Sequence, residues 1–233
     1  MTRSLRPSCG PVPDEAYDVH CRRCQRLARF LDDVAAAHPG YFCRPVPPFG
    51  DMNAHLVIVG LAPGMHGANA SGRPFTGDYA GILLYATLHK FGYASQPRST
   101  GVGDGLALFD ARITNAVKCL PPANKPLPVE VRTCNAYLAA ELTALPDGAA
   151  ILALGRVAHD AVLRALGLAP GAYRFAHGAE HRLSGHDGGA ARLFDCYHCS
   201  RYNTNTGRLT AAMFERVFAA IARYRERTAA EHA

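Results

Sequence analysis

The sequence contains no long apolar run. Purely apolar stretches such as residues 56–59, 82–84 and 149–154 are far shorter than the roughly 20 residues that a membrane-spanning helix needs. The first fifteen residues also lack an apolar stretch after their arginines, so they do not resemble a secretory signal. We therefore expect a soluble, cytoplasmic protein with no membrane partner.

Tryptophan is absent, and lysine occurs only at Lys90, Lys118 and Lys125, so arginine carries most of the positive charge. Lys and Arg (25) outnumber Asp and Glu (19), which gives a formal net charge of +6. A basic surface of this size favours a polyanionic partner, but many metabolic enzymes are equally basic. Charge alone therefore leaves nucleic acid as one of several possible partners. The composition, 48% hydrophobic and 19% charged, excludes a disordered chain.

Short apolar segments alternate with segments of helical periodicity. The predicted strands are 55–60, 109–118, 149–154 and 191–197, and the predicted helices are 13–37, 79–91, 129–145, 156–166 and 209–227. This alternation predicts an α/β fold with three α/β/α layers around a central, mainly parallel four-stranded sheet. We expect residues 1–13, which are rich in proline, to form a loose tail and residues 14–233 to form one domain.

Ligands of such folds bind at the carboxyl ends of the strands, where the loops 61–78, 120–128 and 198–208 are expected to meet. The first of these loops is rich in glycine, which allows the backbone to approach a ligand closely. It lacks the Lys and Ser/Thr of a P-loop and any G-x-G-x-x-G pattern, so a nucleoside triphosphate or dinucleotide site is disfavoured. A second glycine-rich stretch, 101–105, follows no apolar strand and predicts a mobile surface turn.

Eight cysteines without an export signal indicate metal, cluster or catalytic thiols rather than disulfides. Cys21 and Cys24 form a C-x-x-C pair near the amino end of the first predicted helix. Cys119 ends the second predicted strand, and Cys134 lies in the next helix. Four such thiolates suit zinc or an iron–sulfur cluster, whereas the alternative is that Cys119 and Cys134 are small core residues.

A second C-x-x-C pair, Cys196 and Cys199, competes for this role. Along a strand these two side chains would point to opposite faces, which argues against chelation and favours packing or chance. Cys9 and Cys43 have no evident partner in the sequence.

Three loop motifs together resemble one known family. Residues 60–64 read G-L-A-P-G, residues 72–78 read G-R-P-F-T-G-D, and residues 198–203 read H-C-S-R-Y-N. With the four cysteines and the P-P-A-N-K-P loop at 121–126, they resemble the uracil-DNA glycosylase superfamily over nearly the whole chain. The most similar members are the type-B enzymes of family five. The third motif departs from the H-P-S-P of other families at Cys199 and Arg201.

The resemblance implies a DNA glycosylase of base excision repair that flips uracil out of DNA, hydrolyses its N-glycosidic bond and leaves an abasic site. It also allows other damaged bases, such as hypoxanthine or ethenocytosine, and implies a monomer. Cys21, Cys24, Cys119 and Cys134 would hold a [4Fe–4S] cluster that shapes DNA-binding structure and is not needed for bond cleavage.

The resemblance also assigns roles within the site. Asp78, Asn124 and His198 would be the catalytic residues, with Asp78 positioning water. Ala62 stands where most related families carry Asp or Asn, and Phe75 matches the aromatic residue on which the flipped base stacks. His198 is the expected donor to the uracil carbonyl, as a neutral imidazole or as a cation.

Further substrate contacts are expected from the loops. The segment from Gly64 through His66 to Gly67 is predicted to meet the DNA backbone through its N–H groups. On the third loop, Arg201 and Asn203, together with Tyr202, are predicted to fill the gap in the duplex and hold phosphates. Asn115, in the second predicted strand, is a weaker candidate for contact with the base edge.

Each assignment has a structural alternative. Asp78 is well placed to cap the helix that begins at residue 79, and His198 could be a structural histidine. Asn124 lies between prolines, and its role could be limited to forming a turn. Phe75 could be a core aromatic residue. The alternative function is a non-catalytic iron–sulfur or zinc module that binds DNA or transfers electrons. Convergence of Asp78, Asn124 and His198 on one pocket would favour the enzyme.

Overall fold

The computed structural model describes residues 17–143, 145–183 and 191–231. The predicted tail, residues 1–13, and Cys9 lie outside this part of the chain. The strands are β1 (Phe49–Gly50), β2 (Leu56–Gly60), β3 (Ala111–Asn115), β4 (Ala150–Leu154), β5 (Glu180–Leu183) and β6 (Ala191–Cys196). The helices are α1 (Gln25–Ala37), α2 (Ala68–Ser71), α3 (Tyr79–Lys90), α4 (Pro128–Thr143), α5 (Arg156–Ala165), α6 (Arg201–Asn205) and α7 (Ala211–Glu231), with short 3-10 turns η1 (Pro122–Asn124) and η2 (Pro170–Ala172).

The strands form one sheet in the order β1-β3-β2-β4-β6-β5. The four inner strands, β3, β2, β4 and β6, are parallel, and they correspond to the four predicted strands. The predicted count of four was too low because short antiparallel strands, β1 and β5, flank them. β1 has two residues, and β5 (EHRL) is largely exposed, so neither carries the apolar run that marks a buried strand.

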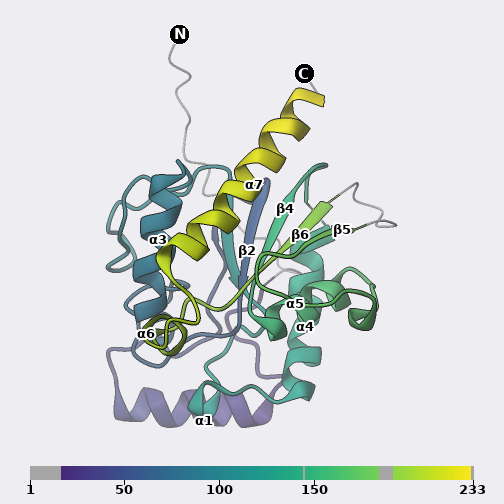
Figure 1. Ribbon diagram of the computed structural model, residues 1–233. Coiled ribbons are helices and arrows are strands. Elements are labelled where there is room, and N and C mark those ends of the chain that lie inside the picture. Colours follow the sequence, from purple (N-terminus) through teal and green to yellow (C-terminus); the bar gives the residue numbers. More distant parts are fainter. Residues whose placement is uncertain (1–16, 144, 184–190, 232–233) are drawn as a thin grey trace.

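Helices cover both faces of the sheet, which confirms the three-layer prediction (Figure 1). Every residue of β2 (LVIVG) and β4 (AILAL) is buried, as expected for parallel strands between two helical layers. Val57 and Val59 pack into the core that contains residues of α1, α4 and α5. Leu56 and Ile58 pack into the opposite core, against α3 and α7. Figure 1 shows α7 in front of the strands and α1 below them.

Two predicted boundaries differ from the structure. The first predicted helix, 13–37, begins only at Gln25, with Cys24 as its N-cap, so the C-x-x-C pair precedes the helix. The strand predicted at 109–118 ends at Asn115, which leaves Cys119 in the connection to α4. Within the described residues, no helix is long and apolar enough to cross a membrane.

Candidate active site

Asp78 lies where the glycine-rich loop after β2 enters α3. It is the N-cap of that helix, and its Oδ1 accepts a hydrogen bond of 2.9 Å from the backbone N–H of Gly81, so the capping interpretation is confirmed. Burial raises the pKa of Asp78, and the N–H groups of Gly81 and Ala80 oppose this shift only in part. A Cβ at Gly67 would lie 2.7 Å from the Asp78 Cβ, so only glycine allows this loop to pack so closely on the carboxylate.

His198 follows β6 by two residues and faces Phe75. The two rings are nearly parallel, with 25° between their planes and 6.0 Å between their centroids. Burial lowers the pKa of His198 to about 4, so the imidazole is neutral near pH 7. The Nδ2 of Asn203 donates a hydrogen bond of 2.8 Å to the His198 carbonyl, which fixes the backbone at this position.

Phe75 and Asn115 meet at the carboxyl end of the sheet. Phe75 has a φ of 54°, in the left-handed region, and is 6% exposed. A Cβ at Gly60 would lie 2.7 Å from Phe75 Cζ and 2.3 Å from Asn115 Oδ1, so both side chains pack over this glycine. Asn115 Oδ1 is buried and has no hydrogen-bond partner among the described residues. An unpaired buried acceptor is costly, which suggests that a ligand supplies its donor.

A pocket of about 460 Å³ opens beside these residues. Asp78 and Phe75 contribute to it from the first loop, and Arg201 contributes from the amino end of α6. The remaining lining residues are Gly77, Tyr79, Gly81, Ile82, Arg98, Ser99 and Thr100. The Arg201 guanidinium lies 5.2 Å from the centre of the Tyr79 ring, a cation–π contact at the rim of the pocket.

The four predicted metal ligands line one separate cavity: Cys21 and Cys24 before α1, Cys119 after β3, and Cys134 on α4. Burial raises the pKa of Cys24 to about 11 and also raises those of Cys119 and Cys134; for Cys119 the three neighbouring thiols add to the effect. One zinc ion with Zn–S distances of about 2.3 Å would hold its thiolates about 3.8 Å apart. Of the residues that the structure describes, no three cysteine sulfurs lie within 4.8 Å of one another.

Comparison with known proteins identifies the family. Residues 47–222 match the model of the Uracil DNA glycosylase superfamily. The chain belongs to this superfamily. It is 46% identical over 199 residues to the type-5 uracil-DNA glycosylase of Thermus thermophilus, with 83% of this chain and 89% of the relative covered.

Mycobacterial members of the superfamily are similar over comparable lengths. Identity to the type-5 uracil-DNA glycosylase of Mycobacterium leprae is 41% over 223 residues, covering 92% of this chain and 96% of the relative. Identity to the type-5 uracil-DNA glycosylase of Mycobacterium bovis is 43% over 206 residues, covering 85% of this chain and 75% of the relative.

The superfamily motifs bring some predicted residues together, but not all. Asn124 ends η1 with a φ of 55° and an exposed side chain, and its N–H donates to the Pro121 carbonyl. In the described part of the chain it forms no hydrogen bond with Asp78 or His198. Asn124 therefore forms a turn, whereas Asp78 lines the pocket and His198 faces Phe75; the catalytic roles of all three stay predictions.

Within the 64–67 segment, one backbone N–H group is engaged inside the protein, and the predicted contact of the segment with DNA stays a prediction. The N–H of Gly67 donates to the Gly64 carbonyl, so it is not free to bind a phosphate. His66 is exposed, and its Nδ1 lies 2.9 Å from the Tyr41 hydroxyl oxygen. Ala62 is half-buried and packs against the core on the α1 side of the sheet.

Cys196 and Cys199 pack in the core, as favoured from the sequence, but the expected geometry of two residues on one strand was wrong. Cys196 ends β6, Cys199 lies beyond the strand, and both are buried in the core between the sheet and α7. Strand alternation therefore does not separate them. Burial raises the pKa of both thiols, and no third ligand-type side chain of the described residues completes a metal site with them.

One group of potential ligands was not foreseen from the sequence. His159, His181 and Asp195 lie together, with His159 Nδ1 2.7 Å from one carboxylate oxygen of Asp195 and His181 Nε2 3.0 Å from the other. His159 Nε2 also lies 3.0 Å from the Tyr173 carbonyl. Burial acts to lower the pKa of His159, but Asp195 and the Tyr173 carbonyl, which face its two ring nitrogens, outweigh it and raise that pKa. The group is thus a buried ion pair that leaves His159 no free nitrogen for a metal.

Sequence reasoning also missed Arg98, Ser99 and Thr100 in the pocket wall. The available signal was the basic residue just before the glycine-rich stretch at 101–105. That stretch does form a turn, as predicted, but Asp104 within it is bonded to Arg73, which argues against the predicted mobility.

Proposed function

We propose that this chain is a monofunctional uracil-DNA glycosylase, acting as a monomer in base excision repair. Its membership of the superfamily and the names of its relatives support this activity. Within the structure, the proposal depends on one observation: Asp78 lines a pocket together with Phe75 and two arginines, and a neutral His198 faces the same Phe75 ring.

The base is expected to bind against Phe75. Asn115 Oδ1 supplies an acceptor that lacks a donor, and uracil carries a donor at N3–H between its two carbonyl groups. Cytosine presents an acceptor at the corresponding ring nitrogen, so the same amide oxygen would repel it. A base buried in duplex DNA reaches this position only by flipping out, at a cost of a few kcal/mol.

Bond cleavage separates two developing charges. The bond between the sugar C1′ and uracil N1 breaks, and its electron pair leaves with uracil while the sugar gains positive charge. A neutral His198 can donate an N–H to a uracil carbonyl oxygen that becomes negative. Ionised Asp78 would stabilise the cationic sugar and orient the water whose oxygen bonds to C1′ and whose proton is released. The products are free uracil and an abasic site.

The four-cysteine cavity fits an iron–sulfur cluster. Its donor set consists of four thiols, the ligand type of iron–sulfur clusters and of structural zinc, and the resemblance to the family-five enzymes favours the cluster. We assign Cys21, Cys24, Cys119 and Cys134 as ligands of a [4Fe–4S] cluster. When bound, the cluster would tie the segment before α1 to α4 and supply no step of the hydrolysis. Cys134→Ser should lower the iron content and the visible absorbance, whereas Cys43→Ser should not.

The experiment that tests the activity is base excision on a labelled oligonucleotide with one uracil opposite guanine. EDTA is present, and alkali then cleaves any abasic site. Asp78→Asn keeps an oxygen that can cap Gly81 and should therefore fold, yet its excision rate should fall at least about a hundredfold. His198→Gln should show a comparable loss.

A folded, DNA-binding wild-type protein that leaves uracil in place would refute the activity. That outcome would favour the non-catalytic iron–sulfur or zinc module. Oligonucleotides with hypoxanthine or ethenocytosine then test the wider substrate range that the family resemblance allows. Here the apolar Ala62 is the residue whose replacement by Asn should narrow that range.

A further inference from the structure

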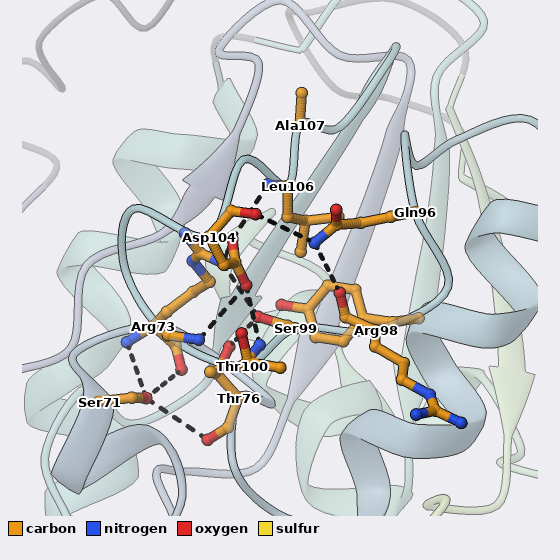
Figure 2. A network of polar contacts seen from close by, with 12 residues as sticks. Ser71, Arg73, Thr76, Gln96, Arg98, Ser99, Thr100, Asp104, Leu106 and Ala107 are labelled. Atoms are coloured by element: carbon orange, nitrogen blue, oxygen red, sulfur yellow. Dashed lines mark hydrogen bonds and ion pairs between the residues drawn. The ribbon is translucent and has the colours of Figure 1, made fainter.

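Residues 98–104, hereafter the 98–104 loop, are organised around one buried carboxylate. Asp104 accepts hydrogen bonds of 2.8 Å from both the Arg73 guanidinium and the Thr100 N–H, and one of 3.0 Å from the N–H of Leu106 (Figure 2). Burial acts to raise the pKa of Asp104, but these donors outweigh it and hold the pKa well below its usual range. The side chains of Asp104 and Arg73 are both less than a tenth exposed, so solvent screens this ion pair weakly.

The same contacts attach the 98–104 loop to the active-site segment. Arg73 also donates to Ser99 Oγ at 3.0 Å, and the Ser99 and Thr76 hydroxyl oxygens lie 2.6 Å apart. Arg73 and Thr76 flank Phe75 in the segment that ends at Asp78. The 98–104 loop is therefore held in a fixed position relative to Phe75 and Asp78.

Arg98 extends away from this network, as Figure 2 shows. Its side chain is exposed and lines the pocket, and within the described part of the chain its guanidinium forms no hydrogen bond or ion pair. Arg201, on α6, contributes a second guanidinium to the lining of the same pocket. Arg201 was predicted from the sequence to bind phosphate, whereas Arg98 has no role in the chemistry derived above.

The covalent structure of DNA places an anion near these arginines. A nucleotide whose sugar reaches Asp78 carries a phosphate on each side of that sugar. Arginine presents a planar fork of donors that matches phosphate geometry, and holding it on a fixed loop reduces the ordering cost of binding. We propose that the 98–104 loop is a phosphate-binding arm in which Arg98 contacts the DNA backbone beside the flipped nucleotide. This inference rests on DNA being the substrate.

Salt dependence of DNA binding tests the arm independently of catalysis. The probe is a fluorescein-labelled duplex with a single 2′-fluoro-2′-deoxyuridine, whose fluorine opposes hydrolysis, and its affinity is measured by anisotropy between about 50 and 200 mM salt. Loss of one phosphate contact should reduce the slope of log K against log salt by about 0.9. We expect this reduction in Arg98→Ala and a retained slope in Arg98→Lys. The matched control is Arg227→Ala, an exposed arginine on the carboxyl-terminal part of α7.

Kinetics provide a second measurement. Arg98→Ala should raise KM for a uracil-containing duplex several-fold with little change in kcat, because the phosphate contact is present before and during cleavage. Two outcomes would refute the phosphate contact of Arg98. One is a salt slope in Arg98→Ala equal to that of wild type. The other is a slope that is reduced equally in Arg98→Ala and Arg98→Lys. Wild-type protein that binds with the expected slopes but excises no uracil would overturn only the proposed activity. A failure of wild type to bind DNA at all would overturn both.

Discussion

The neutral state of His198 has a consequence that unfolding experiments can measure. An exposed histidine has a pKa near 6.5, whereas burial lowers the pKa of His198 to about 4. Below pH 6.5 the unfolded chain therefore binds a proton at this position that the native protein does not bind. The contribution of the neutral ring to stability is complete above pH 6.5 and is lost as the pH falls toward 4.

The size of the effect follows from the shift. A difference of about 2.5 pH units at roughly 1.36 kcal/mol per unit gives a loss of about 3 kcal/mol in the free energy of unfolding. His198→Gln removes the titrating group. We expect wild type to lose about 3 kcal/mol more than this variant between pH 7 and pH 4. Urea unfolding followed by circular dichroism at several pH values measures the difference.

The control is His20→Gln, because the side chain of His20 is exposed. The free energy of unfolding of His20→Gln should change with pH as that of wild type does. If His198→Gln also matches wild type, His198 titrates in the native protein as it does in the unfolded chain. The imidazole would then be partly cationic just below neutral pH, and the assignment of a neutral donor to the uracil carbonyl would be refuted.

Two other substitutions test the packing of the site and of the core. Gly67→Ala places a methyl group 2.7 Å from the Asp78 Cβ, and single-turnover excision should slow about a hundredfold as the carboxylate is displaced; a wild-type rate would contradict this. Glu141→Gln leaves the buried ammonium of Lys118 without its carboxylate and should cost about 3–5 kcal/mol in urea unfolding. Glu215→Gln, which breaks a more exposed pair, should cost less than about 1 kcal/mol, and equal costs would contradict the reasoning.

The features that the sequence predicted well are local ones. β2 and β4 are continuous apolar runs, and a run that is buried on both faces needs no knowledge of its neighbours to be recognised. The N-cap role of Asp78 is likewise a property of one residue and the helix that follows. The edge strands were missed because β1 and β5 depend on pairing with distant segments rather than on their own pattern.

The site was predictable only to the level of its loops. Burial of the Asn115 acceptor without a donor depends on how Phe75 and Gly60 pack, which spacing along the chain does not reveal. Arg98 is separated from Arg73 by 25 positions, so the network that holds its loop is not a sequence motif. In the opposite sense, Asn124 lies in a matching motif, but the structure leaves its side chain exposed.

The two central ionisable groups share one electrostatic property. Burial shifts the pKa of Asp78 upward and that of His198 downward, and both shifts favour the uncharged side chain. A deoxyuridine before cleavage is neutral and interacts only weakly with two such side chains. Charge separation along the glycosidic bond strengthens these interactions. In the proposed mechanism, the cationic sugar would stabilise the Asp78 carboxylate as the uracil anion strengthened the hydrogen bond from His198. The interactions of both residues would therefore increase as the bond breaks, which is the condition for lowering the barrier rather than merely tightening the complex.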